Sequence, residues 1–375
     1  MNCKYIGSTL KVIFALLLAI CLMVVLAACA EMEPGGNSDR TSGVTSSATA
    51  ATTTETPAGT TVAATTVPVG ESFNPLTGEN NVKKGEWTRP VAVMIGNDSK
   101  SSRPQIELDK ADVFMECETE GGITRIMAIF AGASRVPDRL GPTRSSRPPF
   151  ILMARALGAV YVHAGGEERV IQFIRDSNVN NINLIGGGAH GAASWRDESL
   201  KNSRGTEYSM LTSGERINTA VGALKYGKTA PNPLPFKFGN VSDGNLSGNK
   251  LQVTFSASQT VNFTYDAATK LYMKGNGTLS SSTAHKVVSG TTLAVTNVIV
   301  IYDEKFMMTE THVQFRLNSG SGLLVTGGTA RNIKWTCTAN GLNFTDEDGN
   351  ALVLNTGKTY MCLTAAGNKS ATVMQ

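Results

Sequence analysis

A tract of Thr, Ser and Ala divides this chain and limits what can fold on either side of it. Between Thr41 and Val69, 20 of 29 residues are Thr, Ser or Ala, Glu55 is the only charged residue, and no aromatic residue occurs. Such a segment cannot bury enough apolar surface to offset the entropy lost on ordering. We therefore expect residues 29–72 to form a disordered leash, with folded sequence beginning near Phe73.

The first 28 residues have the pattern of a secretory signal. Lys4 and Lys11 precede an uncharged apolar stretch from Val12 to Ala28, and its last residues are small and lead directly to Cys29. This order is typical of bacterial lipoprotein signals. The stretch has 17 residues, whereas a spanning helix needs about 20, so an uncleaved anchor is the weaker interpretation. We expect residues 1–28 to be removed and Cys29 to be acylated, for example with palmitate, which places the protein at the extracytoplasmic face of the cell membrane.

Net charge limits the class of partner. The formal charge is +4, of which Lys4 and Lys11 supply two, so the chain after the signal carries +2. Binding nucleic acid needs a clustered basic face, so we expect no nucleic-acid partner. A nearly neutral chain also lacks a polybasic patch for lipid headgroups, so the N-terminal lipid must hold the protein at the membrane. A cell-wall polymer or another envelope protein is the expected partner.

Cysteine and histidine spacing gives no sign of a metal or cofactor. After Cys29 the chain keeps Cys117, Cys337 and Cys362. Cys337 and Cys362 could form a disulfide and leave Cys117 free, or all three could be buried small apolar residues. No Cys-x-x-Cys or His-x-x-x-His occurs, so we expect no metal site. The glycine loop 186–191 fits Gly-x-Gly-x-x-Gly, but no good helix follows it, so we expect no dinucleotide cofactor.

Residues 73–228 predict an α/β domain with a mixed sheet and flanking helices, because strand and helix patterns alternate. The expected strands are 89–95, 112–119, 124–130, 159–163 and 182–185, and the expected helices are 150–157, 167–175 and 215–224. Gly121 and Gly122 predict a two-residue hairpin turn that places Arg125 opposite Glu118. Ser146 is the expected N-cap of the first helix, and Gly158 its stop.

Residues 235–375 predict an all-β domain. Short strand patterns recur between turn signals, and no helical periodicity of useful length appears. The expected strands are 251–255, 261–265, 271–274, 293–302, 313–317, 332–337, 351–354 and 360–363.

Three arginines before the first helix are the best functional signal. Arg139, Arg144 and Arg147 lie where unpaired backbone N–H groups of a helix start attract anions. Guanidinium groups add charge and bidentate geometry. A phosphate or carboxylate would fit there, although the arginines could equally pair with the Glu116–Glu120 face and fix the loop to the sheet.

Carboxylates and a histidine allow an enzymatic alternative. Glu116, Glu118 and Glu120 share one strand face, and paired carboxylates can do acid–base work. His163 and Asp98 follow strands, where ligands gather in open sheets. The simpler interpretation is a polar sheet face with Glu118 paired to Arg125 and a structural histidine.

Several motifs resemble those of the YerB-type lipoproteins, a bacterial family built around a domain of unknown function. The motifs span roughly residues 73–366 and are Arg89–Ile95, Arg103–Gln105, Ala111–Val113, Glu120–Arg125, Gly141–Arg147, Trp195–Asp197, Asn297–Val300 and Gly357–Tyr360. The resemblance implies a lipid-anchored, two-domain envelope protein, mostly of Gram-positive bacteria. It implies no reaction.

Together these features favour a non-catalytic binding or scaffold lipoprotein of the cell envelope. Its α/β domain would hold an anion near a set of basic residues and one carboxylate, namely Arg125, Arg139, Arg144, Arg147, His163 and Asp98. The first alternative is an envelope hydrolase that uses Asp98, Glu118 and His163. A solute-binding lipoprotein ranks last, because it would need two similar lobes around a cleft and the two predicted domains differ.

Overall fold

The computed structural model describes residues 71–242 and 244–375, so the predicted signal, Cys29 and nearly all of the predicted leash lie outside the described residues. In the described part no helix is both long and apolar enough to cross a membrane. A mixed sheet with few helices and a strand-rich C-terminal region confirm the predicted fold class at that level.

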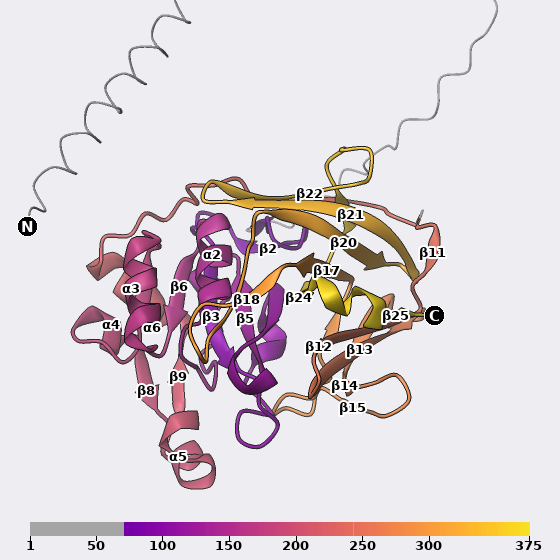
Figure 1. Ribbon diagram of the computed structural model, residues 1–375. Coiled ribbons are helices and arrows are strands. Elements are labelled where there is room, and N and C mark those ends of the chain that lie inside the picture. The colour runs from indigo at the N-terminus through magenta and orange to yellow at the C-terminus, as the bar shows by residue number, and fades with distance from the viewer. Residues whose placement is uncertain (1–70, 243) are drawn as a thin grey trace, which may run out of the picture. The chain divides into compact units, whose positions relative to one another are not determined.

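An eleven-stranded mixed sheet forms the centre of the fold (Figure 1). Its strands, in spatial order, are β11 (Leu246–Ser247), β21 (Thr329–Thr338), β20 (Ser319–Thr326), β17 (Asn297–Asp303), β24 (Thr359–Ala365), β4 (Val113–Glu118), β5 (Thr124–Phe130), β3 (Val91–Gly96), β6 (Val160–His163) and β7 (Asn181–Asn183), with β22 (Gly341–Thr345) paired to β21. β24 lies parallel to both β4 and β17. Strands from both predicted domains therefore share one sheet, and the boundary between 73–228 and 235–375 stays a prediction.

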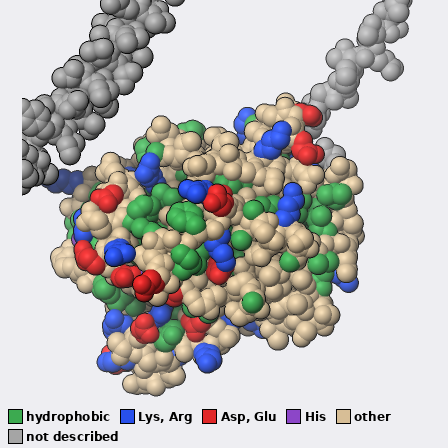
Figure 2. Space-filling view, in the orientation of Figure 1, with side chains coloured by type: hydrophobic (Ala, Val, Ile, Leu, Met, Phe, Trp, Pro, Cys, Tyr) green, Lys and Arg blue, Asp and Glu red, His purple; other side chains and the backbone are tan. Residues whose placement is uncertain are grey.

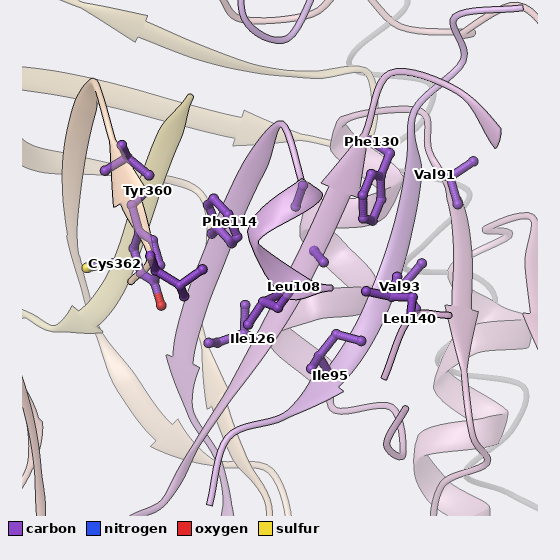
Figure 3. Close-up of a cluster of buried hydrophobic side chains, with 14 of the residues drawn as sticks. Val91, Val93, Ile95, Leu108, Phe114, Ile126, Phe130, Leu140, Tyr360 and Cys362 are labelled. Carbon is purple, nitrogen blue, oxygen red and sulfur yellow. The ribbon is translucent and has the colours of Figure 1, made fainter. Parts of the chain in front are cut away.

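A six-stranded sheet packs against one face of the central sheet. It contains β15 (Ser282–Ala284), β14 (Leu271–Gly277), β13 (Gln259–Asp266), β12 (Lys250–Ser256), β25 (Val373–Met374) and β16 (Ala294–Val295). Its inward residues, such as Phe263, join the same apolar cluster as Phe114 and Tyr360 of the central sheet. Figure 3 shows side chains of neighbouring central strands and Tyr360 meeting in this cluster.

Helices complete the two faces. They are α2 (Pro148–Ala156), α3 (Glu168–Asp176), α4 (Ala189–Ala192), α5 (Glu198–Arg204) and α6 (Gly214–Ala223). α2 packs Phe150 and Met153 on the opposite face of the sheet, in one cluster with Met94. Ile217 of α6 lies on the face that the six-stranded sheet also covers.

Four two-stranded ribbons lie around these layers. They pair β1 (Glu71–Phe73) with β2 (Asn80–Lys83), β8 (Ser194–Arg196) with β9 (Met210–Thr212), β10 (Lys237–Gly239) with β23 (Val353–Asn355), and β18 (Lys305–Met307) with β19 (Val313–Phe315). Short 3₁₀ turns occur at η1 (Leu108–Lys110), η2 (Glu120–Gly122), η3 (Ala133–Arg135), η4 (Thr206–Tyr208) and η5 (Ala366–Ala371).

The covering layers explain why the central strands are easy to recognise. Every residue of β3 is buried, which matches its near-continuous apolar run, because a sheet covered on both faces needs no polar side. β12 instead alternates between buried and half-exposed positions, as expected of a strand with one face toward solvent.

Candidate functional site

Polar side chains that could meet a ligand gather beyond the ends of three strands. β3, β4 and β6 end at Gly96, Glu118 and His163. We call this side of the central sheet the carboxyl edge. β3 and β6 are parallel, and β5 runs antiparallel between β3 and β4, so the three strands end on the same side. Loops from 97–104, 119–123 and 139–147 therefore meet there. Open sheets commonly bind ligands beyond the ends of such strands.

Glu120 is clamped by two of the predicted arginines. The Arg125 Nη2 atom lies 2.8 Å from the Glu120 carboxylate, and Arg147 binds the same carboxylate. Burial acts to raise the pKa of Glu120, but the hydrogen bond from Arg147 and the charges of both arginines lower it to about 2. Burial, with the nearby charge of Arg147, lowers the pKa of Arg125 to about 9. Arg125 is only 3% exposed, so its ion pair with Glu120 fixes the loop to the sheet and offers little surface to solvent.

The predicted hairpin register is wrong by one residue. Thr119 and Ile123 close the turn around the three residues of η2, so Glu118 lies opposite Thr124 and Arg125 lies opposite Cys117. Gly121 and Gly122 both have positive φ, which allows this longer loop.

Glu118 consequently binds a different cation. The Lys305 Nζ atom of β18 lies 2.8 Å from its carboxylate, and that bond joins sequence positions 187 residues apart. The predicted Glu118–Arg125 pair therefore does not form.

The start of α2 does not supply the predicted backbone anion site. The N-cap is Arg147, not Ser146, and Pro148 and Pro149, which have no N–H group, occupy the first two helical positions. The next amide, that of Phe150, donates to the Arg147 carbonyl. The Ser146 hydroxyl instead forms a 2.9 Å hydrogen bond with Tyr161.

Arg144 is a predicted arginine whose ionic partner is an exposed carboxylate. Its guanidinium stacks on the Tyr208 ring at 4.6 Å and donates to the Glu207 carbonyl at 3.1 Å. Its ionic partner is the Glu207 carboxylate at 3.3 Å, and that side chain is 74% exposed. Because exposed ion pairs contribute little, a stronger anion can displace Glu207.

Arg103 was missed by the sequence analysis. Its Nε atom is buried without an acceptor, and within the described residues its guanidinium makes no hydrogen bond or ion pair. Charges of Asp98 and Glu116 act on it, and burial, the larger effect, lowers its pKa. In the sequence, Arg103 stood out only as part of the family motif Arg103–Gln105, because an arginine in a loop follows no periodic pattern that would mark it as a site residue.

Three arginines lie in or against the loop that follows β3, and we call Arg103, Arg144 and Arg204 the arginine cluster. The Arg204 Nη1 atom donates to the Pro104 carbonyl at 2.9 Å and to two further carbonyls of the loop. Asp98 and Glu207 lie beside the cluster, and the charge of the buried Glu116 also acts on Arg103.

Asp98 lies within this loop and is held by it. Its carboxylate accepts hydrogen bonds from the Ser102 hydroxyl and from the Ser101 amide, the latter at 2.9 Å. Burial acts to raise the pKa of Asp98, but these bonds and the charge of Arg144 outweigh it, and the pKa is lowered.

The remaining predicted site residues are placed apart from the cluster. Arg139 is exposed and lies 2.6 Å from the Asp197 carboxylate. His163 is fully buried, with Nδ1 bonded to the Gly165 carbonyl at 2.8 Å and Nε2 at 3.3 Å from the Asn181 side chain. Burial lowers the pKa of His163, which keeps the ring neutral.

The hydrolase alternative lacks its required geometry. Asp98, Glu118 and His163 each have other partners, and in the described part of the chain no hydrogen bond or ion pair joins any two of them. An acid and a base of one catalytic site must lie within hydrogen-bond reach of the same cleft.

A buried ionic network lies between the central and six-stranded sheets. Glu116 and Lys274 are 0% and 1% exposed, and their charged atoms are 3.4 Å apart. Tyr360 and Thr124 each donate to the Glu116 carboxylate at 2.6 Å. His285 bridges the Lys274 Nζ atom and the Gln105 side chain, at 3.0 Å on each side.

The sequence signal for this network is the presence of single charged residues at inward positions of apolar strands. The network has no access to solvent, so we assign it a structural role.

The predicted disulfide between Cys337 and Cys362 does not form. Cys117, Cys337 and Cys362 are free and buried, as the alternative interpretation had it. Cys362 lies in the apolar cluster on one face of the central sheet and Cys337 in the cluster on the other. β17 and β20 separate their strands, a spacing of roughly 14 Å, which a disulfide cannot span.

Charge on the surface is mixed. Figure 2 shows Lys and Arg side chains interspersed with Asp and Glu on the face in view. Among the described residues, no group of three or more His, Cys, Asp or Glu side chains is arranged to hold a metal ion.

Comparisons with known proteins agree with the motifs. Residues 76–226 match the "Protein of unknown function (DUF3048) N-terminal domain", and residues 251–361 match the C-terminal domain of the same name. The YerB protein of Bacillus subtilis strain 168, named as a candidate lipoprotein, is 28% identical over 296 residues, which cover 76% of this chain and 84% of that protein.

A solved structure shows the same fold. The crystal structure of Bacillus subtilis YerB matches with a TM-score of 0.67 at 24% identity, and the match covers 81% of this chain and 99% of that one. The two domain matches together cover more than half of the chain, so the chain belongs to the DUF3048 family.

Proposed function

We propose that this protein is a lipid-anchored, non-catalytic binding protein of the cell envelope that holds an anionic ligand at the arginine cluster. The observation that carries the proposal is the Arg103 guanidinium, which has no acceptor among the described residues and, like Arg144, lies close enough to Asp98 for their charges to interact. A buried Nε–H group without an acceptor is costly. A phosphate or carboxylate that reached Arg103 and Arg144 would form charge-assisted hydrogen bonds.

The ligand class follows from charge and location. A lipid anchor would keep the protein beside the cell wall, whose phosphate- and carboxylate-bearing polymers present many anionic groups. Arg125 and Arg147 support the site indirectly, because their clamp on Glu120 fixes the loop that carries Arg144.

Binding to isolated cell walls tests the anion site. Full-length protein is sedimented with purified walls, with and without prior extraction of their phosphate polymers, at several salt concentrations. The variant Arg103→Ala/Arg144→Ala should bind about tenfold or more weakly, since each charge-assisted bond is worth about 1.5–3 kcal/mol. Arg175→Ala/Arg316→Ala removes the same charge from exposed arginines paired to Glu168 and Glu304, and should leave binding unchanged. Equal losses in both variants would refute a specific site.

Anchoring has its own test. Cys29→Ala should move the protein from the membrane fraction to the medium or the soluble fraction in a bacterial host, because no acyl chain can then be attached. Retention of the variant in the membrane fraction would mean that the stretch Val12–Ala28 is an uncleaved anchor.

A further inference from the structure

A pocket lies at the edge of the central sheet where β3 begins and β5 ends, opposite to the edge that carries the arginine cluster. It has a volume of about 730 Å³, within the usual range for small-molecule sites. The segment before β3, the turn η3 after β5, and the start of α6 form its walls. The side chains that matter below are Glu86, Trp87, Asp138, Glu215, Asn218 and Lys228.

The pocket is lined by more carboxylates than cations, and these carboxylates have no partner among the described residues. Its lining holds the carboxylates of Glu86, Asp138 and Glu215 and one cation, Lys228, although Asp138 also lines a neighbouring pocket with Lys110, Arg135 and Lys358. Over the described residues, none of the three carboxylates has a hydrogen-bond or ion-pair partner. The Glu86 Oε2 atom is moreover buried without a donor, which is a costly state for a carboxylate oxygen. A ligand that draws this side chain into the pocket and donates to it would remove that cost.

An aromatic wall points to the kind of cation. Trp87 packs against the apolar core, and its indole N–H donates to Asn218 of α6 at 3.1 Å, which fixes the ring. Ammonium groups bind favourably over the face of a tryptophan. A bare metal ion is a poorer fit, because these carboxylates are not among any described group close enough to share one.

We propose that this pocket binds a small organic cation that carries a primary ammonium group, with Glu86 and Glu215 as its counter-charges and Trp87 as its apolar wall. The negative charge excludes the anionic polymers assigned to the arginine cluster. The two sites therefore prefer ligands of opposite charge. They lie at opposite ends of the strands of one sheet.

Calorimetric titration of the full-length protein tests this assignment with two matched sugars. D-Glucosamine, at a pH where its amine is protonated, should bind saturably, and N-acetyl-D-glucosamine, which has no ammonium group, should bind about tenfold or more weakly. Glu86→Gln and Trp87→Leu should each weaken glucosamine binding by about two- to fivefold. Glu198→Gln removes an exposed carboxylate of α5 and should leave binding unchanged.

Three results would overturn the assignment. They are equal affinity for both sugars, which indicates a neutral polyol site; no saturable binding of either; and an equal loss in Glu198→Gln, which indicates non-specific attraction. Arg103→Ala/Arg144→Ala should bind glucosamine normally, so failure of the anion site and failure of this site are distinguishable.

Discussion

At the scale of single residues, the buried pair of Glu116 and Lys274 has the largest consequence for stability. Lys274→Met would leave the Glu116 carboxylate buried without its cation, which typically costs about 3–5 kcal/mol. Urea unfolding measures this loss. Lys201→Met removes an exposed lysine paired with Glu198 and should change stability by less than about 0.5 kcal/mol. Similar losses in the two variants would show that the Glu116–Lys274 pair is not held as a buried charge pair.

Glu120 gives a prediction that depends on pH. Its pKa is lowered from 4.5 to about 2 in the folded protein, so its contribution to stability is fully present above about pH 5 and is lost as the pH falls toward 2. The difference in unfolding free energy between the wild type and Glu120→Gln should therefore be constant near neutral pH and shrink in acid. Glu310→Gln, at an exposed position, should show no such pH-dependent difference. A Glu120→Gln difference that persists at pH 2 would contradict the clamp.

The sequence indicated which charged residues lie near the site better than it indicated which of them pair with one another. Of Arg139, Arg144 and Arg147, only Arg147 pairs with the Glu116–Glu120 face, at Glu120, whereas the other two pair with Asp197 and Glu207. Glu118 was assigned to the wrong cation because Lys305 is far away in the sequence and a one-residue change in the turn moves every pairing. Arg103 could not be found, since the lack of an acceptor is a property of the folded surroundings.

At the scale of elements, the β4–β5 hairpin fixes the loop that carries Glu120. Gly122 has φ +74°, and an added Cβ would lie 3.0 Å from the Ser258 hydroxyl. Gly122→Ala should therefore destabilise the protein by about 1–2 kcal/mol, measured by thermal or urea unfolding. Gly187→Ala is the matched control, because that glycine has no positive φ and nothing lies within 4 Å of an added Cβ. If both variants have equal stability, the turn does not constrain the hairpin.

The strongly apolar strands were predictable, and the polar elements were not. β3, β5 and β6 follow apolar runs that only a covered strand needs. β20 was missed because Ser319–Gly322 reads as a turn, although Gly322 is needed there: an added Cβ would lie 2.3 Å from the Val300 carbonyl of the neighbouring strand. α5 was missed because it is short and buries only Leu200.

At the scale of the whole molecule, β24 between β4 and β17 should make the two predicted domains unfold together. Proteins with Trp87 or Trp335 as the sole tryptophan report on the first and second halves of the described chain. Their fluorescence transitions in urea should coincide. Separate midpoints would show that each half is stable without the shared sheet.

The periodicity of the sequence could not predict this arrangement of strands. The position of β24 depends on which strands it pairs with in space, and periodicity does not encode that. The sequence pattern changes near residue 230, whereas the sheet continues across that change. The change in pattern was therefore visible from the sequence, and the continuity of the sheet was not.

The position of β1 has a mechanical consequence. Asn74 donates to Asp112, just before β4 begins, so the described chain enters at the edge of the sheet away from the arginine cluster, which lies at the end of β3. If a lipid holds the N-terminal end and the cluster holds a wall polymer, tension runs roughly along the strands. Such a load pulls β3 along its own axis, so its hydrogen bonds to β5, which lie across the strand, are loaded together and not one after another.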